Sequence, residues 1–304
     1  MNPAEWLVRT ACLSPTAPAL LKGEKIEADY ATFASRVAAI AGALCAKHRI
    51  CKGSRVAIFM NNRTEYLEAM YGIWFAGAVV VPINAKLHAK EAAWIIENAE
   101  AEIAFVSSDG GKALQAFAPK CLKELIYADL PEFSLLRQHV EMARPKVIHE
   151  DELMWLFYTS GTTGRPKGVM ISSGNISSMA MAYFSDVDEV HCNDAILYAA
   201  PMSHGAGIYN FMHVIRGARH VVPDSHGFDA DEILELAPKI DNISMFAAPT
   251  MVKRLVERAR AVGSNANGIK TITYAGGPMY VADIITAVAV LGNKFVQVYG
   301  QGEC

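Results

Sequence analysis

The chain has 304 residues, a net charge of −3 at neutral pH, 52% hydrophobic residues and 19% charged residues. This composition is typical of a globular protein with a buried core and excludes a disordered chain. The slightly acidic balance excludes a globally basic surface, so we expect no nucleic-acid partner.

The sequence favours a protein that is neither exported nor embedded in a membrane. The N-terminus carries Glu5 and lacks a long apolar run, unlike a secretory leader. The most apolar stretch, residues 72–84, is too short to span a bilayer and contains Pro82. The six cysteines include no C-x-x-C pair, so neither a zinc site nor a disulfide framework is indicated and a reducing cytoplasm is the expected setting.

The first half of the chain alternates between short apolar runs and helical patterns. An amphipathic helix is expected over residues 28–47, and residues 129–150, with two prolines, read as a surface excursion. The other predicted elements are strands at 55–60, 79–83, 102–107 and 153–159, and helices at 64–76 and 90–99.

The second half repeats this alternation more regularly. Thr250 is expected to cap the helix that follows it. Strands are predicted at 195–201, 218–223, 242–248, 270–275 and 294–299, and helices at 207–217, 229–239, 250–261 and 279–291. Because the strand runs are continuously apolar, they indicate burial on both faces, as in a parallel sheet covered by helices.

These patterns predict an α/β fold of two doubly wound, mainly parallel βα lobes. Lobe one is expected to span about residues 50–185, and lobe two about 186–304 together with 1–49. The chain stops at the C-terminal edge of its last strand, where ligands bind in open α/β sheets. It therefore reads as a domain that has been cut off.

The segment YTSGTTGRPKG, residues 158–168, combines hydroxyl side chains, glycines and Lys167. Glycines let successive backbone N–H groups converge on an anion, and a lysine adds a mobile charge for a terminal phosphate. A Walker loop is excluded because Pro166 precedes the lysine and Gly168 follows it. The competing interpretation is a flexible surface turn, which the length of the pattern disfavours.

This segment resembles the signature of the adenylate-forming superfamily, which includes acyl- and aryl-CoA synthetases, peptide-synthetase adenylation domains and beetle luciferases. Further similar blocks follow the family's order at residues 72–84, 201–207, 274–279 and 298–303. The resemblance covers essentially the whole chain and is greatest to the acyl/aryl-CoA synthetase branch. It implies that the chain is a truncated N-terminal adenylation domain, spanning residues 1–304 without the family's C-terminal domain.

The resemblance implies a role for each matching residue. ATP would bind at Thr159, Ser160, Gly161, Thr162, Thr163, Gly164, Lys167, Gly276, Gly277, Pro278, Tyr299 and Gly300. Tyr299 would lie against the adenine, the alternative being a core aromatic. Glu303 would bind Mg²⁺, which prefers carboxylates together with phosphate oxygens, the alternative being an ordinary exposed acid. Gly302 departs from the family, which has Thr there, so a hydroxyl that would contact the α-phosphate is missing.

The block PMSHGAG would border the acid substrate. His204 would act as a gate beside the carboxylate, and with Lys167 it is a candidate catalytic residue; a structural histidine is the alternative. The segment carries no acid to pair with an ammonium group, which argues against an amino-acid substrate. The expected pocket residues are small or apolar: Met202, His204, Gly205, Ala206, Gly207, Tyr209, Pro249, Thr250, Tyr274 and Ala275.

The function implied is ATP- and Mg²⁺-dependent activation of a carboxylic acid with an apolar tail to an acyl-adenylate, followed by transfer to CoA. The truncated chain is expected to be inactive alone, because the C-terminal lysine of the family is absent. Three alternatives stay open: delivery to a carrier-protein thiol, a non-catalytic nucleotide-binding protein of the same fold, and a phosphotransferase that would produce ADP. Homodimer formation also stays open.

Overall fold

The structure, a computed structural model, describes residues 1–159 and 165–302, and within these ranges the strands form two sheets. The order in the larger sheet is β13 (Phe295–Gln297), β12 (Ile269–Tyr274), β11 (Ile243–Ala247), β9 (Ala195–Leu197), β10 (Arg219–Val222), β1 (Pro18–Lys22) and β2 (Lys25–Asp29). The order in the smaller sheet is β6 (Glu124–Tyr127), β5 (Ile103–Val106), β3 (Arg55–Phe59), β4 (Val79–Pro82), β7 (Leu153–Thr159) and β8 (Lys167–Ser172).

All neighbouring strands are parallel except the pairs β1–β2 and β7–β8. The prediction of two mainly parallel α/β sheets is therefore confirmed. The helices that cover these sheets are α1 (Ala4–Leu13), α2 (Tyr30–Ala46), α3 (Thr64–Phe75), α4 (Ala89–Asn98), α5 (Ser108–Gln115), α6 (Pro131–Leu136), α7 (Ser173–Asp186), α8 (Gly205–Ile208), α9 (Asn210–Arg216), α10 (Ala230–Ile240), α11 (Pro249–Val262) and α12 (Val281–Leu291).

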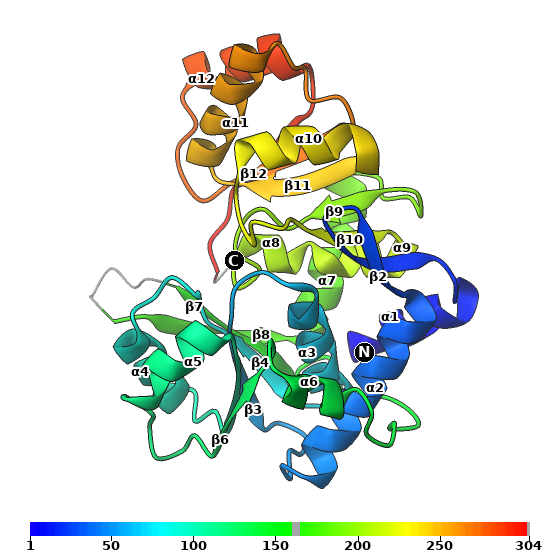
Figure 1. The fold of residues 1–304 in the computed structure, drawn as a ribbon, viewed down its shortest axis with the longest axis vertical. Helices are drawn as coiled ribbons and strands as arrows, with labels where there is room; N and C mark the ends of the chain where they lie inside the picture. Colours follow the sequence, from blue (N-terminus) through cyan, green and yellow to red (C-terminus); the bar gives the residue numbers. More distant parts are fainter. Residues whose placement is uncertain (160–164, 303–304) are drawn as a thin grey trace.

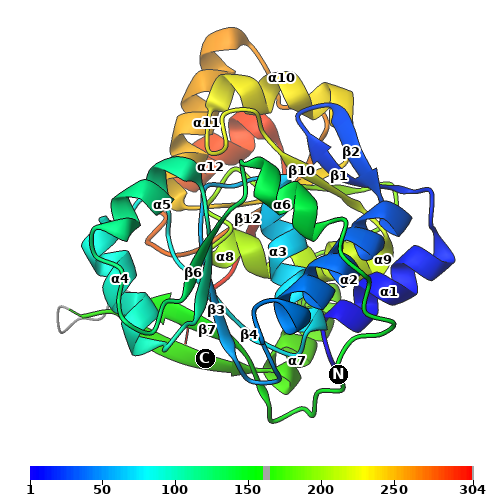
Figure 2. The same ribbon diagram turned by 60° about the horizontal axis from the view of Figure 1, so that its bottom comes forward.

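The elements stack in layers, with a shared helical layer between the two sheets (Figure 1). Side chains of α10, α11 and α12 pack on the outer face of the larger sheet, and those of α4 and α5 on the outer face of the smaller one. The inner faces of both sheets contribute to one core with α1, α2, α3 and α9. Figure 2 shows α1, α2 and α9 beside one another in this layer.

Aromatic side chains join the two sheets at the centre of this core. Trp74 of α3 packs on Phe211 of α9 with ring centroids 5.3 Å apart, and on Trp155 of β7 at 5.8 Å. The indole N–H of Trp74 donates to the carbonyl of Met154, 2.9 Å away. These rings are fully buried. They therefore hold α3 and strand β7 of the smaller sheet against α9.

Two details of the expected helices are wrong. The helix expected over residues 207–217 is divided into α8 and α9, because Tyr209 leaves the helical path and the Asn210 side chain donates to the carbonyl of Gly207. Thr250 does not cap α11: the N-cap is Ala248, and Pro249 takes the first helical position, which its fixed φ angle favours. In addition, the expected surface excursion contains α6, whose Phe133 is buried.

No helix within the described residues combines the length and apolarity needed to cross a membrane.

Candidate functional site

The segment that carries the predicted phosphate loop connects two antiparallel strands. Thr159 ends β7, Lys167 begins β8, and the two residues face each other across the ladder. The Lys167 side chain is exposed, and the guanidinium of Arg165 lies 5.9 Å from the centre of the Trp94 ring on α4. Both ends of the turn are thereby held on the smaller sheet. The other predicted loop residues, Ser160, Gly161, Thr162, Thr163 and Gly164, lie outside the described residues.

The two segments that carry the expected adenine-binding residues extend from the same edge of the larger sheet. The backbone N–H of Val298 donates to the carbonyl of Tyr274, 3.0 Å away, so the segments after β12 and β13 start at the same edge. Gly276, Gly277 and Pro278 are exposed there, as are Tyr299 and Gly300. The side chain of Tyr299 is 91% exposed, which excludes the alternative of a core aromatic.

The last described residues connect the two sheets. From β13 the chain runs toward β7 and β8 (Figure 1), where Gly302 packs against the hairpin. A Cβ built on Gly302 would lie 3.0 Å from Thr159 Cγ2 and 3.1 Å from both Phe157 Cδ1 and Val169 Cγ2. Glycine at this position therefore permits a close approach that a threonine side chain would obstruct. Glu303 lies outside the described residues.

His204 lies between β9 and α8, close to the same hairpin. Its ring packs edge-on against Phe157 of β7 with centroids 5.8 Å apart, and its Nδ1 lies 2.9 Å from Ser203 Oγ. Burial lowers the pKa of His204, so the imidazole is neutral at pH 7. The Phe157 ring thus links His204 to strand β7, which leads into the predicted phosphate loop.

The expected acid-pocket residues divide between two faces of the larger sheet. Ala206 and Met202 are buried, and Tyr209 stacks on Phe246 of β11 with centroids 5.6 Å apart. Burial raises the pKa of Tyr209 to about 12, so its hydroxyl stays protonated. Tyr274, by contrast, packs with Phe295 in the core beneath α10–α12, on the face opposite Tyr209, and Ala275 follows it half-buried at the strand end.

A cavity of about 300 Å³ opens between the sheets, and of the expected pocket residues its lining contains Thr250. Asn62 organises one wall: its side-chain amide donates to the carbonyls of Tyr198 and Ala200, both at 2.8 Å, and its Oδ1 accepts from the N–H of Met202 at 2.9 Å. The lining also contains polar and cationic side chains, namely Asn61, Asn84, Lys86, Ser203, His226, Thr250 and Arg254. The asparagines that follow the predicted strands 55–60 and 79–83 were the sequence signal for this site.

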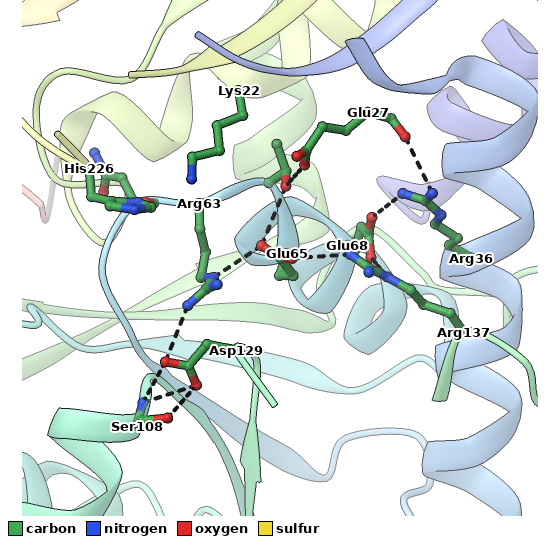
Figure 3. Close-up of polar contacts among 12 residues, drawn as sticks. Lys22, Glu27, Arg36, Arg63, Glu65, Glu68, Ser108, Asp129, Arg137 and His226 are labelled. Atoms are coloured by element: carbon green, nitrogen blue, oxygen red, sulfur yellow. Dashed lines mark hydrogen bonds and ion pairs between the residues drawn. The ribbon is translucent and has the colours of Figure 1, made fainter. Parts of the chain in front are cut away.

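A charged cluster supports the α3 end of this cavity (Figure 3). Glu68 has no exposed surface and accepts from Arg36 Nη1 at 3.0 Å and Arg137 Nε at 2.6 Å. Arg63, which precedes α3, pairs with Glu65 at 3.0 Å and with Asp129 at 3.8 Å. Burial alone would raise the pKa of Glu65, but the neighbouring arginines outweigh it and lower that pKa. The cluster ties α3 to α2 and to the segments after β6 and α6.

Within the described part of the chain, no group of three or more His, Cys, Asp or Glu side chains is arranged to hold a metal ion. The five cysteines in the same ranges are free thiols.

The chain is similar to known proteins over nearly its whole length. The sequence profile of the AMP-binding enzyme family matches residues 7–304. Among curated relatives, a feruloyl-CoA synthase of Amycolatopsis sp and the long-chain-fatty-acid–CoA ligase FadD13 of Mycobacterium tuberculosis are each 28% identical over 98% of this chain. The chain spans 59% and 60% of their lengths, respectively.

Solved structures agree with this result. The inhibitor-bound N-terminal domain of FACL13 from Mycobacterium tuberculosis superposes with a TM-score of 0.88 at 25% identity, covering 99% of this chain and 76% of that one. The O-succinylbenzoate CoA synthetase of Bacillus subtilis in complex with AMP superposes with a TM-score of 0.82 at 25% identity, covering 97% and 73%. The chain belongs to the AMP-binding enzyme family.

Proposed function

We propose that the complete protein, of which this chain would be the N-terminal adenylation domain, activates a carboxylic acid with an apolar tail through an acyl-adenylate, whose acyl group is then transferred to the thiol of CoA. The chain alone is expected to have little or no activity. The observation that carries the proposal is the packing of Gly302 on Thr159 and Phe157. It brings the exposed adenine-side residues of the larger sheet to the phosphate-side hairpin of the smaller one. One extended nucleotide can contact both.

In the first step the acid's carboxylate oxygen would attack the α-phosphorus of ATP and pyrophosphate would leave. Positioned donors and cations stabilise the charge that develops on the phosphoryl oxygens. Lys167 and the hydroxyls of the turn are the groups of this chain suited to hold the β- and γ-phosphates. Mg²⁺, when bound by Glu303 and phosphate oxygens, would neutralise further charge.

The environment of His204 fits a place beside the acid's carboxylate. The neutral imidazole can donate one hydrogen bond to a carboxylate oxygen without forming a fixed ion pair. Its aromatic contact with Phe157 limits its rotation. The small and apolar residues of α8 would then border the tail, and they offer no carboxylate to an ammonium group. We therefore exclude α-amino acids from the proposed substrates.

The cavity beside Ser203 suits the second step. Lys86 and Arg254 supply positive charge at its lining, and Asn61 and Asn84 supply neutral donors, which together favour a phosphate-bearing co-substrate such as CoA. Curated relatives named as CoA ligases support this choice. A second candidate acceptor is a carrier-protein thiol, since the fatty acid–[acyl-carrier-protein] ligase ScoC of Streptomyces coeruleorubidus is 26% identical over 95% of this chain.

The test is release of AMP by the complete gene product with ATP, Mg²⁺, a panel of carboxylic acids, and either CoA or a phosphopantetheinylated carrier protein. We expect acid-dependent AMP and an acyl-CoA thioester. Thioester on the carrier alone would support the second candidate. Production of ADP would overturn the proposal in favour of phosphoryl transfer, and absence of any nucleotide turnover would favour a non-catalytic protein.

A further inference from the structure

Aromatic rings lie close to the segment that follows His204. Tyr209 stacks on Phe246 with an interplanar angle of 24°, and Tyr183 of α7 meets Tyr209 edge-on with centroids 5.3 Å apart. Figure 1 shows α7 and α8 between the two sheets, with α8 against β11 of the larger sheet. Tyr209 and Phe246 are only half-buried, so their remaining surface is available to a ligand.

The ring of Phe246 lies directly over Gly205. A Cβ built on Gly205 would be 2.9 Å from Phe246 Cζ, 3.1 Å from Cε1 and 3.2 Å from Cε2. Real Cβ atoms do not approach ring carbons so closely without displacement, because interiors are close-packed. A substrate tail that passes His204 over Gly205 therefore meets the Phe246 ring and has to lie along it or displace it.

Beyond Phe246 the same face of the sheet becomes polar. Ser244 lies two residues deeper on β11 and shares that face. Its hydroxyl donates to Asp188 at 3.2 Å, and Lys270 pairs with the same carboxylate at 3.3 Å. Thr271 and Thr273, opposite Ser244 and Phe246 on β12, are buried on this face. Because these groups are already buried and packed, an alkyl chain extending past Phe246 would have to displace them, which is unfavourable in a close-packed interior.

We infer that the acid activated at this site carries an aromatic ring close to its carboxylate, and that Phe246 and Tyr209 determine this specificity. A flat ring can stack on the half-exposed aromatic faces and ends before the polar residues of β11 and β12. A long flexible chain does neither. This inference rests on the proposed function, since it assumes that the carboxylate lies beside His204.

The test is calorimetric binding to the 304-residue chain of adenosine 5′-sulfamates whose acyl group is benzoyl, cinnamoyl or dodecanoyl, with unacylated adenosine 5′-sulfamate as the reference. We expect the aryl compounds to bind roughly three- to tenfold tighter than the dodecanoyl compound, corresponding to the stacking of an aromatic pair. Binding of the reference compound measures the nucleotide site independently. If no compound binds, the proposed function fails and this inference with it.

Substitutions separate the aromatic rings from the rest of the site. Phe246→Ala and Tyr209→Ala should each weaken the binding of the aryl compounds by roughly three- to tenfold. The difference in affinity between the aryl compounds and the dodecanoyl compound should decrease accordingly. Binding of the unacylated reference should not change, which also shows that the variants are folded. Phe117→Ala, at a half-exposed ring on the smaller sheet's far side, is the matched control. Equal or tighter binding of the dodecanoyl compound to the unsubstituted chain, or unchanged aryl binding in both variants, would overturn the inference.

Discussion

Gly302 lies against Thr159, so that the segment after the last strand of one sheet touches the hairpin that begins and ends the phosphate loop in the other. Nothing larger than hydrogen fits between them without displacement, since a Cβ at position 302 would come within 3.0–3.1 Å of three side chains. The residue that lacks the hydroxyl therefore also lies where the edges of the two sheets come into contact.

This contact predicts that Gly302→Ala weakens nucleotide binding. The added methyl group has to push the segment away from Thr159, and overpacking of this kind costs about 1–3 kcal/mol. We expect AMP affinity to fall by roughly tenfold in a calorimetric titration. Gly227→Ala is the matched control, because a Cβ there meets no atom within 4 Å. Unchanged AMP affinity in Gly302→Ala would show that the two segments separate freely.

The burial of Glu68 predicts that its substitution strongly lowers the stability of the fold. It is fully buried between Arg36 and Arg137. Its removal takes the shared carboxylate from both guanidinium groups and leaves Arg137 with Glu65 at 3.4 Å and Arg36 with the carbonyl of Glu27 at 3.3 Å (Figure 3). Glu68→Ala should lower the free energy of unfolding by about 3–5 kcal/mol in urea denaturation. Glu24→Ala removes an exposed partner of Lys239 and should change it by less than about 1 kcal/mol. Similar small losses for both variants would contradict a structural role for the cluster.

Much of this fold follows from local pattern. The strands at 55–59, 79–82, 103–106 and 243–247 are short, mostly apolar runs, which are typical of a buried parallel sheet. The strands β2 and β8 were not predicted because they are antiparallel additions with half-exposed residues: KIEAD has no apolar run, and the apolar run in KGVMIS is only three residues long. The division of α8 from α9 depends on a hydrogen bond that Asn210 makes to Gly207, which helical periodicity does not encode.

The candidate site was predictable where one motif carries it and not where distant segments meet. The turn between Thr159 and Lys167 carries a continuous signature. The cavity, in contrast, combines strand ends near residues 62, 84 and 203 with the start of α11. Phe246 is one apolar residue in an apolar strand, and its position over Gly205 depends on the register of the folded sheet. No local pattern distinguishes such a residue from the rest of the core.

Buried histidines predict how stability depends on pH. Burial lowers the pKa of His213 to about 4, and that of His220 well below its usual value. The unfolded chain takes up protons near pH 6.5 whereas the folded chain does not, so stability should fall as the pH decreases from about 6.5 to 4. The contribution of His213 between pH 7 and pH 5 is roughly 2 kcal/mol.

His213→Asn tests this sign. The Nδ1 atom of His213 lies 2.8 Å from the carbonyl of Tyr209, and an asparagine amide can donate to the same oxygen without titrating. The difference in unfolding free energy between pH 7 and pH 5, from urea denaturation, should therefore shrink by roughly 2 kcal/mol in the variant. His191→Asn, at an exposed position, should leave the difference unchanged. An undiminished pH dependence in His213→Asn would show that other groups cause it.

The proposed role of Lys167 predicts that its substitution weakens the binding of ATP but not that of AMP. The proposed function assigns its ammonium group to the β- and γ-phosphates, which ATP has and AMP lacks. Lys167→Ala should therefore weaken ATP binding by about 10- to 100-fold, the value of one charge-assisted hydrogen bond, and leave AMP binding within about twofold. Lys239→Ala, which removes a charge from a comparably exposed position on α10, controls for the change in net charge. Equal losses for ATP and AMP would mean that Lys167 supports the shape of the hairpin, and no loss for ATP would remove this lysine from the phosphate site.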